Sequence, residues 1–81
     1  MLVRTLTELK ANEYGIIREI LGGASLTNRL GALGIIPGQK ITKISSMFSK
    51  GPVTVQVNRS QIALGFGMAS KILVDVERKS E

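Results

Sequence analysis

The sequence has 81 residues, with 11 lysines and arginines against 6 aspartates and glutamates, and it contains neither cysteine nor histidine. Disulfide bonds and zinc sites built on Cys and His are therefore excluded. We expect a single domain over residues 1–81, whose small core leaves no interior room for a cofactor. No apolar stretch approaches the ~20 residues of a membrane span, and the N-terminus lacks a signal-peptide core. These features predict a soluble, cytoplasmic protein.

The charges are distributed unevenly along the chain. No Asp or Glu lies between Ile20 and Val74. Basic residues do lie there, namely Arg29, Lys40, Lys43, Lys50, Arg59 and Lys71. A folded domain with this pattern has a positive field over much of its surface, which suits nucleic acid, an anionic membrane or an acidic protein. Charge that serves only solubility explains the pattern equally well.

The N-terminal part of the chain predicts a helical turn followed by a strand. Residues 5–12 form the turn, with Thr5 or Thr7 as its cap, and Asn12 tolerates the left-handed conformation that often closes such turns. Residues 14–21 are rich in isoleucine and bounded by glycines, which favours a strand. Because their apolar positions do not alternate cleanly, we expect a bulge or a strong bend in this strand.

One α-helix is predicted over residues 25–33. Ser25 is a good N-cap, and Leu26, Leu30 and Leu33 follow the i, i+4, i+7 spacing of an apolar stripe that faces the core. Gly34 then takes the position after the last helical turn, where a positive φ is required.

A turn and the remaining strands complete the expected fold. Residues 36–39 predict a type II turn, because proline sets φ at its second position and glycine accepts a positive φ at its third. Strands are expected at 39–47, 53–58, 60–65 and 72–77, with a loop at 49–52, a tight turn at 58–59 and a helical turn at 66–71. The sequence therefore predicts a mainly β fold, a small five-stranded barrel with one short helix between its first two strands.

The glycine-rich stretch at residues 29–40 matches no nucleotide-binding motif. A Walker A loop needs GxxxxGK[ST], but Gly34 and Gly38 are too close together and Gln39 replaces the lysine. A dinucleotide fingerprint follows a strand and precedes a helix, which is the reverse of the order here. The tetrapeptide GALG fits the GxxG of a KH loop, but its Leu33 belongs to the apolar stripe. We interpret the stretch as a helix C-cap followed by a turn.

Side chains suited to catalysis or metal binding are scarce. Without His and Cys, a base or nucleophile has to come from Asp, Glu, Lys, Ser or Thr. Asp75 and Glu77 lie two apart on the last strand, but a solvated strand face is the simpler interpretation. A tight transition-metal site would depend on these carboxylates together with Met1, Met47 and Met68. We therefore expect no enzyme activity and no catalytic, cofactor or metal site.

The order of the motifs resembles the FeoA family. These are small SH3-like barrel proteins that accompany FeoB, the bacterial ferrous iron transporter with a cytosolic GTP-binding domain. The likeness runs from about Leu6 to Val76, and GPVTVQV, SQIALG and MASKILVDVE add to it. Its most specific part is R-L-x-x-L-G-[apolar]-x-P-G, carried by Arg29, Leu30, Leu33, Gly34, Ile35, Pro37 and Gly38. Many family members have Pro-Gly where this chain has Ala11-Asn12, and Asn12 can adopt the conformation of that glycine.

The resemblance implies an SH3-like barrel and a non-enzymatic accessory protein that binds FeoB in the cytosol and supports ferrous iron uptake. Such a protein would be a monomer or weak oligomer that reaches the membrane only through its partner. The alternative is a small-barrel nucleic-acid binder that uses the acid-free basic centre. Three aromatic residues (Tyr14, Phe48 and Phe66) are few for stacking bases, so we expect no nucleic acid. A metal or ligand sensor is disfavoured by the missing ligands.

The partner-binding surface is predicted at the end of the helix and the turn that follows it. The apolar stripe faces the barrel, which leaves Arg29 pointing outward. Ile35 and Ile36 are adjacent at a turn, so both cannot be buried easily and one is expected to form an exposed apolar spot. Arg29, Lys40 and Lys43 would form a basic rim around it. We predict that the apolar spot supplies affinity and that the rim steers the approach of the partner.

Overall fold

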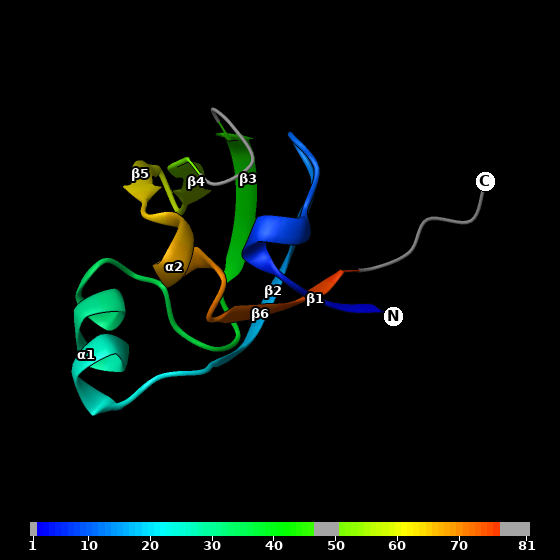
Figure 1. Cartoon of the computed structure of the whole chain (residues 1–81). Helices are drawn as coiled ribbons and strands as arrows, with labels where there is room; N and C mark the ends of the chain where they lie inside the picture. Colours follow the sequence, from blue (N-terminus) through cyan, green and yellow to red (C-terminus); the bar gives the residue numbers. More distant parts are fainter. Residues whose placement is uncertain (1, 47–50, 77–81) are drawn as a thin grey trace.

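The computed structural model describes residues 2–46 and 51–76, which form a six-stranded antiparallel sheet with α1 beside it (Figure 1). In chain order the elements are β1 (Leu2–Thr5), η1 (Leu6–Glu8), β2 (Tyr14–Ile20), α1 (Ala24–Ala32), β3 (Lys40–Ser46), β4 (Val53–Val57), β5 (Ser60–Leu64), α2 (Phe66–Ala69) and β6 (Ile72–Val76). The order of strands in the sheet is β1-β6-β2-β3-β4-β5. The sheet is strongly curved, so that β1 and β6 run across the direction of β3 and β4 (Figure 1).

Alternation of apolar and polar residues explains which face of the sheet is buried. Along β4, Val53, Val55 and Val57 are buried while the residues between them are only partly covered. Along β6 the same pattern holds, with every second residue buried. Successive side chains of a strand point to opposite faces, so one face of the curved sheet forms an aliphatic core. The predicted strands, the turn at 58–59 and the short helical turn α2 are confirmed within the described residues. Residues 47 and 77, the predicted ends of two strands, and residues 49–50 of the predicted loop lie outside the described residues.

The expected number of strands was one too few. Residues 2–5 form β1, which pairs with β6 in a register that places Leu2 opposite Val76. Four residues carry little local signal for a strand, and the partner of β1 lies at the other end of the chain. As a result α1 lies between the second and third strands of the chain, not between the first two.

A β-bulge interrupts β2, as the irregular apolar pattern predicted. The pairing with β6 shifts between Ile17 and Glu19, which leaves Arg18 as the extra residue. The Arg18 Nη1 donates to Asp75 Oδ1 on β6 at 3.0 Å. The bulge lets one buried position, Ile17, be followed by two exposed ones.

The chain between β1 and β2 also follows the prediction. Thr5 is the N-cap of η1, and its N–H donates to the Glu8 carboxylate at 2.8 Å. Asn12 has the expected left-handed conformation, with φ at +71°. Its N–H donates to the carbonyl of Lys43 on β3 at 2.6 Å, which joins this turn to the sheet.

The predicted helix is confirmed, but its ends and its apolar stripe differ in detail. Its N-cap is Gly23, which accepts a hydrogen bond from the N–H of Thr27 at 3.1 Å, so Ser25 lies within the first turn. Leu30 is fully buried and Leu26 packs against the core, but Leu33 is 46% exposed. Leu33 is the C-cap, where the backbone leaves the helix, and its side chain no longer follows the stripe.

Candidate partner-binding surface

A Schellman motif ends α1 and sends the chain back into the core. Gly34 has a φ of +88°, and its N–H donates to the carbonyl of Gly31 at 3.0 Å. The N–H of Ile35 donates to the carbonyl of Leu30 at 2.9 Å. These two bonds define the motif, which usually includes an apolar contact between the residues of the longer bond. Leu30 and Ile35 are indeed both fully buried.

The next four residues form the predicted type II turn, and the turn is attached to β2. The N–H of Gln39 donates to the carbonyl of Ile36 at 3.1 Å, and Gly38 has a φ of +92°. The N–H of Gly38 donates to the carbonyl of Ile17 at 2.8 Å, and the N–H of Ile17 donates to the carbonyl of Gln39 at 2.9 Å. Because Ile35 is held in the core and Gln39 is bound to β2, Ile36 stays on the surface with 47% of its area exposed.

The exposed residues at the end of α1 form a small apolar spot beside a basic side chain. A Cβ added to Gly31 would lie 3.7 Å from Ile36 Cγ2, so Ile36 lies against the last turn of the helix. Arg29 is exposed in the last turn of α1, and Leu33 is exposed at the C-cap that follows. A cation in the last turn interacts favourably with the helix dipole. We call Arg29, Leu33 and Ile36 the helix-end patch.

Of the five residues predicted to contact a partner, the structure exposes three and buries two. Arg29, Ile36 and Lys40 are exposed, whereas Ile35 and Lys43 are buried. Ile35 and Ile36 thus divide as the sequence suggested, with one inside and one outside.

Lys43 is buried because it lies on the core face of β3, opposite Val55. Its Nζ donates to the carbonyl of Leu9 at 2.6 Å and to that of Thr7 at 3.1 Å. Burial lowers the pKa of this ammonium, and the nearby Glu13 carboxylate partly opposes that shift. Lys43 therefore holds the segment after η1 against the sheet and does not belong to a basic rim.

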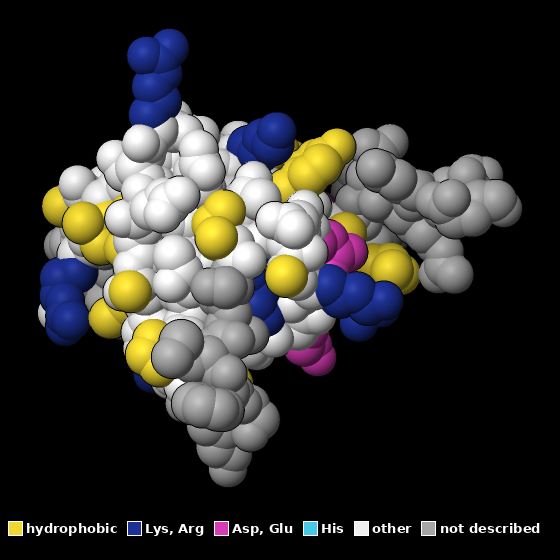
Figure 2. Space-filling model, turned by 90° about the horizontal axis from the view of Figure 1, so that it is seen from above, with side chains coloured by type: hydrophobic (Ala, Val, Ile, Leu, Met, Phe, Trp, Pro, Cys, Tyr) yellow, Lys and Arg dark blue, Asp and Glu magenta, His cyan; other side chains and the backbone are white. Residues whose placement is uncertain are grey.

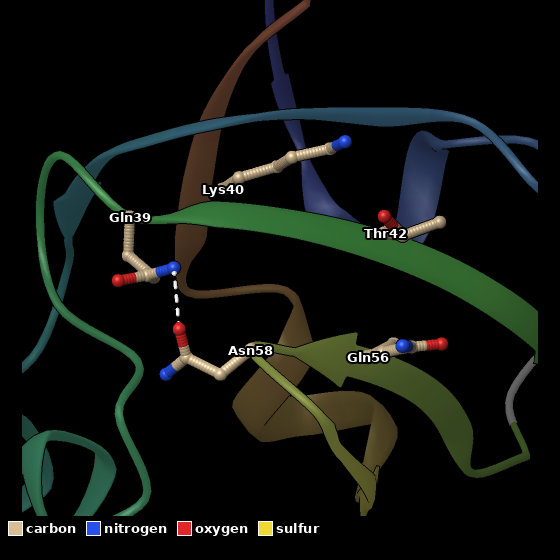
Figure 3. Close-up of a pocket in the computed structure, with 5 residues that line it drawn as sticks. All are labelled: Gln39, Lys40, Thr42, Gln56 and Asn58. Carbon is tan, nitrogen blue, oxygen red and sulfur yellow. Dashed lines mark hydrogen bonds between the residues drawn. The ribbon is translucent and has the colours of Figure 1, made fainter.

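A polar depression of about 180 Å³ lies on the outer side of β3 and β4 (Figure 3). Thr42 and Gln56 are direct partners across these two strands. At one end of the depression the Gln39 Nε2 donates to Asn58 Oδ1 at 3.2 Å. Its lining residues are Gln39, Lys40, Thr42, Gln56 and Asn58. Only Lys40 among them was singled out from the sequence, although the alternation along β3 and β4 already places 40, 42 and 56 on the polar face.

Lys40 lies over an aromatic ring on the same face. Its Nζ is 4.5 Å from the centroid of the Tyr14 ring, within the range of a cation–π interaction. Ile16 lies directly opposite Lys40 on β2, and both Tyr14 and Ile16 are 44% exposed. Within residues 2–46 and 51–76, the ion pair found is the one between Arg18 and Asp75, so Lys40 has no carboxylate partner there.

The described part of the chain offers no metal centre. Within it, no group of three His, Cys, Asp or Glu side chains is placed to hold an ion. Asp75 pairs with Arg18, and Met68 packs against the core. The other candidates, Met1, Met47 and Glu77, lie outside the described residues. The described helices are also all too short or too polar to cross a membrane.

Figure 2 shows how side chains of different types are distributed over one face of the domain. On the face shown in Figure 2, hydrophobic side chains form separate spots among polar atoms, and the basic side chains lie mostly around the edge. The fold defines a small, mainly β domain.

Comparison with known proteins identifies the family. The FeoA domain model matches residues 4–76, and the chain belongs to the FeoA family. A protein of Methanocaldococcus jannaschii described as an Fe(2+) transport protein A is 36% identical over 66 residues, which cover 82% of this chain and 78% of that protein. Members of this family are non-catalytic accessory proteins of ferrous iron transport, so the chain is associated with iron transport machinery.

Solved structures agree with this assignment. An iron uptake regulatory protein (FeoA) is 32% identical with a TM-score of 0.83, and the match covers 93% of this chain and 97% of that one. A FeoA of Stenotrophomonas maltophilia, complexed with zinc and described as a prokaryotic SH3 domain protein, is 27% identical with a TM-score of 0.75. That match covers 88% of each chain. The SH3-like fold expected from the sequence is thus that of the family.

Proposed function

We propose that the chain is a non-enzymatic cytosolic protein that binds a FeoB-type transporter and supports ferrous iron uptake. The observation that carries this proposal is the match to the FeoA family over residues 4–76. In this role the chain acts as one domain over residues 1–81, a closed SH3-like barrel. It is a monomer or weak oligomer, and it reaches the membrane only through the transporter.

The docking surface that we propose consists of the helix-end patch and Lys40. Ile36 supports this assignment because the buried Ile35 and the hydrogen bonds between the turn and β2 hold it on the surface. A side chain that is already held in place loses little conformational freedom on binding, so its burial contributes fully to affinity. Arg29 and Lys40 add the positive charge that steers an acidic partner. The buried Ile35 and Lys43 leave the set of contacts.

The alternatives receive less support from the same surface. Tyr14 is 44% exposed, but Lys40 already lies over its ring, so this face is not free to stack on a base. Phe48 lies outside the described residues. In the proposed role, iron is the cargo of the transporter and is not held by this chain, whose sequence contains neither Cys nor His.

The proposal is tested by capture of the purified transporter, in full-length form and as its cytosolic part. We expect Ile36→Asp and Arg29→Glu to reduce the affinity by about tenfold while leaving circular dichroism and melting unchanged. Val3→Asp is the matched control, because Val3 is 48% exposed but lies on the edge strand β1. The same affinity for wild type and both folded variants would place the interface elsewhere on the domain. No capture of wild type would contradict the function.

A further inference from the structure

We propose that the polar depression receives a carboxylate side chain, Asp or Glu, from the cytosolic part of the transporter. This inference rests on the proposed function and specifies the chemistry of the partner at the docking surface. The depression adjoins the type II turn that holds Ile36, because Gln39 belongs to both.

The charge of the depression favours an anion. Lys40 is its one charged lining residue, and within residues 2–46 and 51–76 no carboxylate pairs with it. The Tyr14 ring fixes the direction of the Lys40 side chain but does not neutralise its charge. The sequence contains no Asp or Glu between Ile20 and Val74, so β3, β4 and β5 supply no carboxylate of their own. The ammonium is therefore held in place with its charge available to an external group.

Neutral groups that can donate hydrogen bonds line the depression together with Lys40. Thr42 provides a hydroxyl, Gln56 provides an amide, and both lie on the outer side of the sheet with Lys40 (Figure 3). The bond from Gln39 Nε2 occupies Asn58 Oδ1, which leaves the Asn58 Nδ2 hydrogens as donors. A carboxylate accepts hydrogen bonds at two oxygens with about four lone-pair sites, so it can accept from more than one donor at a time.

The surroundings favour a protein carboxylate over the phosphates of a nucleic acid. A phosphate backbone is usually bound by several cations along a track, whereas this depression contains a single lysine. Ile16, opposite Lys40, is 44% exposed, and Ile36 is 47% exposed. Apolar area beside a single charged contact is typical of protein interfaces.

The first experiment measures the affinity of the full-length transporter for variants of this chain in which one basic residue is substituted. Lys40→Gln is expected to weaken binding by about tenfold and to reduce the salt dependence, whereas Lys40→Arg retains most of the affinity. Arg4→Gln removes the same charge from β1, which β6 and β2 separate from β3, and is expected to bind like wild type. If Lys40→Gln binds as tightly as wild type, the inference is wrong although the proposed function stands.

The second experiment needs no transporter. N-acetyl-glutamate is titrated into the isotope-labelled chain, and side-chain amide signals of Gln39, Gln56 and Asn58 are followed by NMR. We expect saturable shifts of these signals in wild type and none in Lys40→Gln. Inorganic phosphate is titrated in parallel, and a response to phosphate alone would overturn the carboxylate assignment. If the shifts appear but wild type does not capture the transporter, the proposed function fails while the carboxylate site remains.

Discussion

The β4–β5 hairpin and the crossing from α1 to β3 use the same residue types in opposite ways. In the hairpin, regular alternation buries Val53, Val55 and Val57, and no large hydrophobic side chain is among the strongly exposed ones. In the crossing, two neighbouring isoleucines divide between core and solvent, and Leu33 is also exposed. The hairpin buries its large apolar side chains or covers them in part, whereas the crossing leaves apolar area exposed to solvent.

This difference shows how the irregular backbone of the crossing keeps apolar side chains at the surface. A strand repeats every two residues, so a side chain that faces solvent is followed by one that faces the core. The Schellman motif and the type II turn break that period at Gly34 and Gly38, both with a positive φ. They hold Ile36 on the surface next to the end of α1. The exposed Ile36 side chain does not stabilise the domain.

The largest expected effect is a difference in the free energy of unfolding between variants of the two isoleucines of the crossing. Ile35→Ala removes a fully buried side chain and is expected to lower the free energy of unfolding by about 2–5 kcal/mol, as in the core of the hairpin. Ile36→Ala is the control and is expected to change it by less than about 0.5 kcal/mol. Urea denaturation measures both values. Equal losses would show that the crossing does not divide its isoleucines as described.

A smaller effect is expected at Lys43, on the strand that joins both regions to the rest of the sheet. Lys43→Met removes the donor to the carbonyls of Thr7 and Leu9, one of them buried. Leaving buried carbonyls without a partner costs about 1–3 kcal/mol. Lys43→Arg, which retains a donor, is the control and should lose less. A fully stable Lys43→Met would show that these two hydrogen bonds contribute nothing measurable.

Lys43 also makes the stability of the wild type depend on pH, with a defined sign. Burial lowers the pKa of Lys43 in the folded state below its ordinary 10.5. Between these two pKa values the unfolded chain binds more protons, so this residue makes stability rise with pH. The stability of wild type relative to Lys43→Met should therefore increase from neutral pH towards pH 10.5. A relative stability that falls over this range would contradict the direction of the pKa shift.

The smallest expected effect concerns the residues with a left-handed backbone conformation in the two regions. Gly34→Val places a β-branched side chain at a φ of +88°, so we expect a loss of more than ~1 kcal/mol. In the hairpin, Asn58 has a φ of +56°, and Asn58→Gly should change stability by only a few tenths of a kcal/mol. Thermal melting of both variants checks the difference. A wild-type melting curve for Gly34→Val would contradict the cap.

Local sequence signals were sufficient for most of the secondary structure. The alternation at residues 53–57, the turn at Asn58 and the Pro37-Gly38 pair each state a backbone preference within a few residues, and the structure agrees with all three. The strand at residues 2–5 escaped detection because its pairing with β6 joins the two ends of the chain. The exposure of Leu33 escaped detection because the helix ends just before it.

By itself the sequence determined the class of the protein and the identity of its turns, because backbone preferences and residue chemistry are local properties. Three features follow from the sequence alone: the absence of Cys and His, the acid-free centre and the motif around Gly34. Only the tertiary structure decided which groups the basic residues of β3 contact. Alternation places Lys40 and Lys43 on opposite faces of one strand, but it does not show that Lys40 lies over Tyr14 or that Lys43 donates to the carbonyls of Thr7 and Leu9. That outcome depends on strand register and on which segments cover each face, and both arise from contacts between distant parts of the chain.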